Sequence, residues 1–435
     1  MANVELMYKE KLRTPIEIAK SIPPGTEMFT DSGLSQPREI GFAMKEAAKE
    51  GAISGITVHT ILDLYPAPWY DQECADRIHG VSWFSGGNAR ASVRRNQADI
   101  MPCRYAEMAE LLALNPQIDC LCIAVSPMDQ DGYFTSGLTS ALSGDFIKTN
   151  AKTIILEVNK KMPRSVTGNK IHISQVDMFC ECDYDLPVQG DTEIDEISKT
   201  IGALIAEETP NGATLQLGIG AIPESVGLAL KNHKDLGIHT ELFTDSMIEL
   251  LECGAVTNEL KPIHKGKTVA TFAFGSKRLY DYIADNPLVE LLPVNYVNNP
   301  EVIAQHPNFL SVNSAIEVDF FGQVCAESVG TKHVSGSGGQ WEYVRGTTRS
   351  KGGKSFIAFS STAGDGKISR IMPTLTPGAQ ITTGKNDVDH IVTEYGIAKL
   401  RGKTLSQRTK ELIRIAHPDF RDMLTFEAKK LGILI

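Results

Sequence analysis

Short apolar runs alternate with amphipathic stretches along this chain. Residues 151–159 (Ala-Lys-Thr-Ile-Ile-Leu-Glu-Val-Asn) are typical of a buried strand, whereas residues 37–45 (Pro-Arg-Glu-Ile-Gly-Phe-Ala-Met-Lys) are typical of a helix with one apolar face. Strands that alternate with such helices form mostly parallel sheets covered by helices. The pattern therefore predicts an α/β fold.

The same pattern occurs twice. Residues 24–45 and 210–231 each predict a turn, a short strand, a loop and a helix, and both helices share Pro-x-x-(Ile/Val)-Gly-(Phe/Leu)-Ala-(Met/Leu)-Lys. We expect each proline at the first helical position, where no amide donor is lost. Two further matches follow in the same order, which pair residues 55–59 with 237–241 and residues 151–159 with 388–396.

These matches predict an internal duplication. We expect two topologically related open-sheet α/β domains, an N-terminal one over residues 1–190 and a C-terminal one over residues 191–435. Acidic residues with Pro187 and Gly190 occupy residues 183–196, which predicts the linker. In this alignment His59 of the first half corresponds to Glu241 of the second. Ligands of open parallel sheets bind outside the carboxyl ends of the strands, so this difference between the halves points to function.

Composition narrows the range of partners. The 435 residues contain 43 Lys and Arg against 53 Asp and Glu, a net charge of −10, which argues against nucleic-acid binding because phosphate recognition needs a basic face. We find no basic amphipathic segment, no signal-peptide pattern and no apolar run near the ~20 residues of a membrane span. The Cys120/Cys122 and Cys180/Cys182 pairs lack ligand spacing, so we expect buried packing thiols, no metal and a cytoplasmic protein.

Two glycine-rich loops are candidate ligand sites. Residues 216–223 (Gln-Leu-Gly-Ile-Gly-Ala-Ile-Pro) begin like a dinucleotide loop, but Pro223 replaces the third glycine, which argues against NAD. Gly218 and Gly220 still allow backbone amides to approach a phosphate or a developing oxyanion at a helix N-terminus. The second loop, residues 335–343, lies downstream of residues 316–320, whose alternation of apolar and acidic residues predicts a half-buried strand.

Two carboxylates compete as the reactive group. Glu241 ends an apolar strand before a helix that Thr244 or Asp245 can cap, and Glu394 has a similar setting. Spacing alone leaves both open. His59 and His239 are more typical of structural hydrogen bonding than of a catalytic base.

Three arginines, Arg90, Arg94 and Arg95, follow Gly86-Gly87-Asn88. They suit binding of a carboxylate or phosphate, and they suit a solvated surface equally well.

Several motifs together resemble the acetyl-CoA hydrolase/transferase family, and within it the 4-hydroxybutyrate and butyryl CoA-transferases. They are Gly-Ile-Gly-Ala-Ile-Pro at 218–223, His-Thr-Glu at 239–241, Gly-Gly-Gln at 338–340, and Val-Thr-Glu-Tyr-Gly-Ile-Ala at 392–398 with Leu-Arg-Gly at 400–402. The similarity extends over nearly the whole chain. Trp341 resembles the butyryl-type enzymes, whereas Glu342 stands where relatives often have Asp.

The resemblance implies a fold, a site and a reaction. It places an active site at the interface of the two domains and makes Glu241 the residue that forms a covalent thioester with coenzyme A. It assigns coenzyme A binding to two loops and a neighbouring strand, with the residues Gly218, Ile219, Gly220, Ala221, Ile222, Ile316, Gly338, Gly339 and Gln340. The backbone amides of Gly220 and Ala221 would then be oxyanion donors.

The implied activity is transfer of coenzyme A between a short-chain acyl-CoA and a carboxylate, of the 4-hydroxybutyrate or butyrate type with acetate or acetyl-CoA as partner. It needs no permanently bound cofactor, since coenzyme A is itself a substrate, and the resemblance suggests a homodimer or higher homo-oligomer. Two alternatives stay open. An acyl-CoA hydrolase would use the same glutamate with water, and a coenzyme A-sensing protein without catalysis would keep the loops but would not need Glu241.

Overall fold

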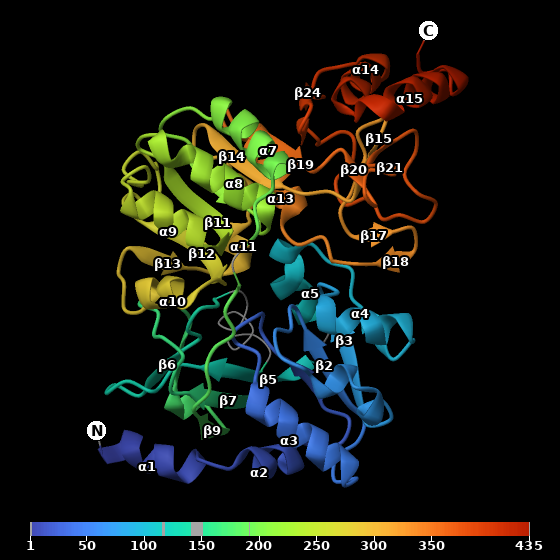
Figure 1. Ribbon diagram of the computed structural model, residues 1–435. Coiled ribbons are helices and arrows are strands. Elements are labelled where there is room, and N and C mark those ends of the chain that lie inside the picture. Colours follow the sequence, from blue (N-terminus) through green and yellow to red (C-terminus); the bar gives the residue numbers. More distant parts are fainter. Residues whose placement is uncertain (1, 115–117, 141–150, 191, 435) are drawn as a thin grey trace. The chain divides into compact units, whose positions relative to one another are not determined.

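We analysed the protein in a computed structural model that describes residues 2–114, 118–140, 151–190 and 192–434 (Figure 1). The chain divides into two compact units. The first comprises residues 1–189 and 270–296, and the second comprises residues 190–269 and 297–435. The first boundary lies in the acidic segment expected as the linker. The return of residues 270–296 to the first unit differs from the expected division into two uninterrupted stretches.

The first unit is built on a parallel sheet with the strand order β4-β3-β2-β1-β5-β7-β9. Its strands are β1 Glu27–Phe29, β2 Ile56–Thr60, β3 Ile78–Ser82, β4 Ala98–Ile100, β5 Ile118–Val125, β7 Thr153–Asn159 and β9 Met178–Cys182. Its N-terminal helices are α1 Ala2–Lys11, α2 Pro15–Ser21, α3 Arg38–Lys49, α4 Gly87–Arg94 and α5 Met108–Leu114. Within residues 270–296 lie α10 Lys277–Ile283 and β13 Val289–Leu291.

The apolar face of α3 packs with α2 on one face of this sheet. Cys120, Cys122 and Cys180 belong to the same buried cluster, and all eight cysteines are free thiols. The prediction of packing thiols is therefore confirmed for these three. No helix formed by the described residues is long and apolar enough to cross a membrane.

The second unit repeats this design. Its strands β11 Gly237–Phe243, β10 Thr214–Leu217, β14 Phe309–Asn313, β19 Lys354–Ala358 and β23 His390–Thr393 lie side by side in that order and run parallel, and β24 Gly396–Lys399 adds an antiparallel edge. The main helices are α7 Glu196–Glu207, α8 Ala221–Ala229, α9 Asp245–Glu252, α13 Gln340–Arg349, α14 Leu405–Ile415 and α15 Pro418–Lys430. Short strands extend from this body, among them β15 Glu317–Asp319, β16 Val324–Cys325, β17 Ser328–Val329, β18 Lys332–His333 and β22 Ile371–Met372 (Figure 1).

The strand orders agree with the predicted duplication and correct its details. The order β2-β1-β5-β7-β9 recurs as β11-β10-β14-β19-β23, so β7 corresponds to β19 and the predicted match of residues 151–159 with 388–396 is wrong. Apolar strands buried on both faces resemble one another too closely for composition to identify the pair.

The pairing register corrects a second match. Glu27 on β1 lies opposite Thr57, and Thr214 on β10 lies opposite Gly237. If the two turns with Gly25 (φ +80°) and Gly212 (φ +76°) are superimposed, Thr57 corresponds to Gly237, and His59 corresponds to His239 rather than to Glu241. A shift by two residues keeps each side chain on the same face of the strand, so the hydrophobic pattern could not detect the error.

Local helix starts also differ from expectation. Helix α3 begins at Arg38 with Pro37 as its N-cap, and α8 begins at Ala221, two residues before Pro223. Both prolines still stand where a missing amide costs no helical hydrogen bond. Thr244 is the N-cap of α9, but its side chain makes no capping hydrogen bond.

The strand over Glu317–Asp319 was predicted to be half-buried and is buried throughout. Hydrogen bonds explain why both acidic side chains point inward. Glu317 accepts hydrogen bonds from the backbone and hydroxyl of Thr376, and Asp319 accepts them from the Gln323 side chain and two backbone amides.

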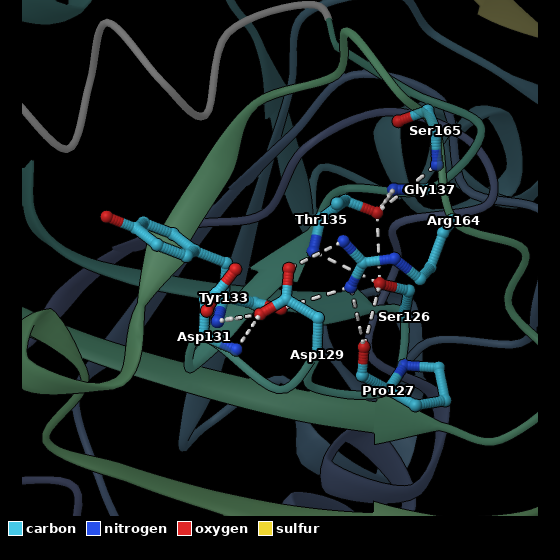
Figure 2. A network of polar contacts seen from close by, with 9 residues as sticks. All are labelled: Ser126, Pro127, Asp129, Asp131, Tyr133, Thr135, Gly137, Arg164 and Ser165. Atoms are coloured by element: carbon cyan, nitrogen blue, oxygen red, sulfur yellow. Dashed lines mark hydrogen bonds and ion pairs between the residues drawn. The ribbon is translucent and has the colours of Figure 1, made fainter. Parts of the chain in front are cut away.

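A polar network fixes the loop at the carboxyl end of β5 (Figure 2). Arg164 Nη2 donates to Asp129 Oδ2 at 2.8 Å, and its Nη1 donates to the carbonyl of Tyr133. Burial opposes ionisation of Asp129, but hydrogen bonds from the Tyr133 amide and from Arg164 outweigh it and lower the pKa of Asp129. Arg164 therefore connects several residues of this loop within the first unit.

A buried carboxylate on β7 caps α3. Glu157 accepts hydrogen bonds from the amides of Arg38 (2.8 Å) and Ile40 (2.7 Å) and from the Tyr184 hydroxyl (2.6 Å). We expect Glu157→Ala to lower the free energy of unfolding by about 3 kcal/mol, because three buried donors lose their acceptor. Urea unfolding measures this loss. Glu46→Ala on the exposed face of α3 is the control, and equal losses in both variants would contradict the capping role.

Candidate active site

Glu241 lies near the carboxyl end of β11, at the sheet edge where ligands of parallel sheets bind. Its Oε2 accepts a hydrogen bond of 2.6 Å from Nδ2 of Asn298, and a second one comes from the Gly339 backbone amide. Asn298 is completely buried, whereas Glu241 keeps part of its surface exposed. The carboxylate is thus held by two hydrogen-bond donors in a residue that is half-buried as a whole.

The main chain at Gly339 lies directly against the Glu241 and Asn298 side chains. A β-carbon at position 339 would lie 2.1 Å from Glu241 Oε2 and 2.3 Å from Asn298 Nδ2, which is closer than real contacts allow. The preceding Gly338 has φ +53°, a left-handed conformation that favours glycine. The two glycines of this loop therefore let the main chain approach the carboxylate.

The surroundings of Glu241 change its acidity. Burial raises the pKa of Glu241 to about 7, even though the hydrogen bonds from Asn298 and from the Gly339 amide lower it. A carboxyl group with a pKa near neutrality at a sheet edge is typical of a reactive group.

Residues 219–222 of the loop 218–222 line a pocket at the same sheet edge, whereas Gly218 lies outside its lining. Gly220 has φ +108°, a conformation that residues with a β-carbon rarely adopt, and it precedes the free N-terminus of α8. Ile219 is exposed. The pocket is also lined by residues at the start of α7, in α8, at the ends of β14 and β19, and before β22. They are Asp195, Ile197, Ser198, Pro223, Ser314, Ala358, Phe359, Ser360 and Arg370.

The remaining predicted binding residues have structural contacts. Gln340 Nε2 donates to the carbonyl of Ser314 at 2.7 Å, and its Oε1 accepts from Thr383, so its side chain ties α13 to the pocket wall. Ile316 is half-buried and precedes β15, and its carbonyl accepts from Arg370. Because Gln340 follows Gly339 directly, these contacts join the Glu241 loop to the pocket of loop 218–222.

Glu394 has a different environment from Glu241. It lies in the turn between β23 and β24, where both its oxygens accept hydrogen bonds from Ser361, at 2.9 Å from the amide and 2.6 Å from the hydroxyl. Its carboxylate is therefore committed to holding the 360–361 segment. Geometry separates two glutamates that spacing left equal.

The two histidines form structural hydrogen bonds. His59 is buried, lies 2.8 Å from Glu27 and accepts from Trp83, all within the first unit. His239 is buried and lies 2.7 Å from the Val297 carbonyl. Burial lowers the pKa of both imidazoles, and their hydrogen bonds favour the structural interpretation.

The arginines of α4 are exposed. Arg90 and Arg94 lie on the helix, and Arg95 ends it with hydrogen bonds to Gln97 and Ser92. Their binding of a ligand stays a prediction.

Trp341, expected to resemble the butyryl-type enzymes, and Glu342, expected to differ from relatives, both lie on α13. Trp341 donates to Asp387 at 3.0 Å, and Glu342 is buried. Within the described ranges, no group of His, Cys, Asp and Glu side chains is arranged to hold a metal ion.

The sequence did not identify Asn298 as a residue of the site. It stands in Val-Asn-Asn-Pro at 297–300, where Asn299 caps the short helix α12 Pro300–Ile303. An Asn before an Asn-Pro turn predicts a loop, and nothing in its spacing points to a carboxylate 57 residues earlier.

Comparisons with known proteins show the family. Residues 2–188 match the model of the acetyl-CoA hydrolase/transferase N-terminal domain, and residues 275–428 match that of the C-terminal domain. Succinyl-CoA:cyclohexane-1-carboxylate CoA transferase of Geobacter metallireducens is 43% identical over 98% of this chain and 97% of its own. 4-Hydroxybutyrate coenzyme A transferase of Clostridium kluyveri is 41% identical over 98% of this chain and 99% of its own.

A solved structure is similar throughout. RipA from Yersinia pestis is 36% identical to this chain and matches it with a TM-score of 0.95 over 99% of this chain and 100% of that chain.

Proposed function

Because the chain belongs to the acetyl-CoA hydrolase/transferase family, we propose that it transfers coenzyme A between a short-chain acyl-CoA and a carboxylate acceptor, with Glu241 as the nucleophile. The observation that carries the proposal is the Glu241 carboxylate, desolvated at a sheet edge and held by Asn298 and by the Gly339 amide. Relatives at 36–43% identity are named for 4-hydroxybutyrate, butyrate and cyclohexane-1-carboxylate, which supports a carboxylate acceptor of this kind.

The first half of the reaction forms a covalent enzyme. A Glu241 oxygen attacks the thioester carbonyl carbon, the carbon–sulfur bond breaks, and an acyl–glutamyl anhydride and a coenzyme A thiolate result. The thiolate then attacks the glutamyl carbonyl carbon, which releases the acyl group as a carboxylate and leaves a glutamyl–coenzyme A thioester. Dividing the exchange in this way is nucleophilic catalysis.

The second half reverses these steps with another carboxylate. The acceptor attacks the glutamyl thioester to give a new anhydride and thiolate, and the thiolate attacks the acceptor's carbonyl to give the product acyl-CoA and free Glu241. Asn298 Nδ2 and the Gly339 amide lie on the carboxylate that becomes tetrahedral, so they are suited to stabilise its oxyanion. The Gly220 and Ala221 amides stay candidates for the acyl carbonyl.

Loop 218–222 and its pocket are suited to hold coenzyme A. The free N-terminus of α8 favours negative charge, and binding energy from the distant part of coenzyme A assists the chemistry at the thioester. The steps use only groups of the chain and its substrates, and we propose that no cofactor is permanently bound. Eight free thiols support a reducing compartment such as the cytoplasm. A homo-oligomer stays a prediction, which light scattering tests.

Steady-state kinetics test the proposal. We expect parallel double-reciprocal plots for acyl-CoA against acceptor, and product acyl-CoA from acetate, butyrate or 4-hydroxybutyrate. Acid release at the same rate with and without acceptor would identify a hydrolase instead. Coenzyme A binding without turnover of any acyl-CoA would favour the sensing protein.

The reaction should depend on pH through Glu241. The attacking form is the carboxylate, so kcat/KM for acyl-CoA should rise about tenfold per pH unit below pH 7 and level off above it. Initial rates between pH 5 and 9 measure this limb, with thermal unfolding at each pH as the control for folding. A flat profile down to pH 5 would contradict a carboxyl group of raised pKa as the nucleophile.

A further inference from the structure

The hydrogen bonds around Glu241 extend to one residue that the proposed mechanism does not use. His239 and Glu241 are two residues apart on β11, so both side chains leave the same face of the strand. His239 Nε2 lies 2.7 Å from the carbonyl oxygen of Val297. Val297 directly precedes Asn298, whose Nδ2 donates to Glu241 Oε2. The four residues close a ring of contacts that begins and ends on one strand.

The proton of His239 has a defined place in this ring. A carbonyl oxygen only accepts hydrogen bonds, so Nε2 carries the proton and donates it to Val297. Aromatic rings surround the imidazole, with the centroid of His306 at 5.0 Å and that of Phe309 at 6.1 Å. The ring is completely buried and has no room to turn away without repacking these neighbours.

The segment that carries Asn298 needs such an anchor. Asn298 lies between two helices of four residues each, α11 Val294–Val297 and α12 Pro300–Ile303, and helices this short fix little by themselves. On the far side Asn299 caps α12 by accepting from the Glu301 amide at 2.8 Å. On the near side the described contact that ties the Val297 carbonyl to the sheet is His239.

We propose that His239 is a positioning residue for Glu241, which holds the Val297 carbonyl so that the Asn298 amide donates to the carboxylate. This role rests on the proposed function for its catalytic meaning, but its effect on the Glu241 carboxyl group is separate from turnover. Without the hydrogen bond from His239 to Val297, Asn298 moves away from the carboxylate. The Gly339 amide alone then counteracts the rise in the pKa of Glu241 that burial causes.

The direct test follows the titration of the Glu241 carboxyl carbon by ¹³C NMR of glutamate-labelled protein, assigned by its absence in Glu241→Gln. We expect His239→Phe to raise the titration midpoint by about one pH unit, because a hydrogen bond to a charged group is lost. Asn298→Ala should raise it equally, and the double variant should raise it no further. His239→Gln, whose amide reaches the position of Nε2, should restore the wild-type midpoint.

Neighbouring groups define the controls. The titratable groups near His239 are His306, Lys261 and His264, and Tyr343 lies near Glu241. His306→Phe changes the packing of the same buried cluster but leaves the Val297 contact intact, so its Glu241 midpoint should equal that of the wild type. If His239→Phe does not fold, His239→Asn replaces it, since its shorter amide cannot reach the Val297 carbonyl.

Kinetics add a second readout. His239→Phe should lower kcat up to about 100-fold with little change in KM for acyl-CoA, and His239→Gln should recover most of it. An unchanged Glu241 midpoint in His239→Phe or in Asn298→Ala, or an equal shift in His306→Phe, would overturn the proposal. Full activity of Glu241→Gln would overturn the nucleophile instead and leave the titration result standing.

Discussion

Glu241→Gln should fold normally, bind coenzyme A and lose transferase activity by about 1,000-fold or more. The amide has the volume of the carboxylate, and loop 218–222 is untouched, so binding is retained. An amide cannot form the anhydride through which the proposed reaction passes. Calorimetry with coenzyme A and transfer assays with acyl-CoA and acetate measure the two properties separately.

Covalent labelling shows which glutamate reacts. Wild-type protein incubated with acyl-CoA and then with borohydride, which reduces thioesters, should be modified within the peptide that contains His239-Thr240-Glu241. Glu394→Gln is the matched control, because it alters the competing glutamate at the same sheet edge and should leave the label on Glu241. Label on Glu394, or robust transfer by Glu241→Gln, would overturn the nucleophile and the proposed reaction.

Gly339→Ala should lower kcat by about 100-fold, although the substitution adds only one methyl group. The new β-carbon would lie 2.1 Å from Glu241 Oε2 and 2.3 Å from Asn298 Nδ2, so the carboxylate or the amide must move from its present place. We expect the hydrogen bond between Glu241 and Asn298 to be lost in this variant, because the site depends on the close approach of the Gly339 main chain.

A second glycine in the same unit provides the control. Gly384 has nothing within 4 Å of its added β-carbon and an ordinary backbone conformation, so Gly384→Ala should keep full activity. Thermal unfolding of both variants separates a local effect from loss of the fold. Wild-type kcat in Gly339→Ala would mean that this loop does not define the position of Glu241.

The sequence by itself determined the class of fold and its duplication. Alternating apolar strands and amphipathic helices require helices packed on parallel sheets, because that arrangement buries both faces of the strands. The repeated helix motif at residues 37–45 and 223–231 marked the same strand–loop–helix unit in both halves, where α3 follows β1 and α8 follows β10. These features are local, so local pattern was enough to find them.

Register and strand identity needed the tertiary structure. The pairing of Thr214 with Gly237 showed that His59 corresponds to His239, and the sheet order showed that β7 corresponds to β19. Shifts by two residues preserve the alternation of faces, and buried strands share one composition. Neither error leaves a trace in the hydrophobic pattern.

The residues of the site also fall into two groups, those that the sequence identified and those that only the tertiary structure revealed. Sequence and family resemblance selected Glu241 and the glycine loops, because charge in an apolar strand and clustered glycines are costly features of a chain. Only the fold brought Asn298 and Gly339 onto the carboxylate, committed Glu394 to Ser361 and placed His239 on the Val297 carbonyl. These partners lie 33 to 98 residues apart along the chain, and hydrogen bonds between such distant segments depend on three-dimensional packing that no spacing rule encodes.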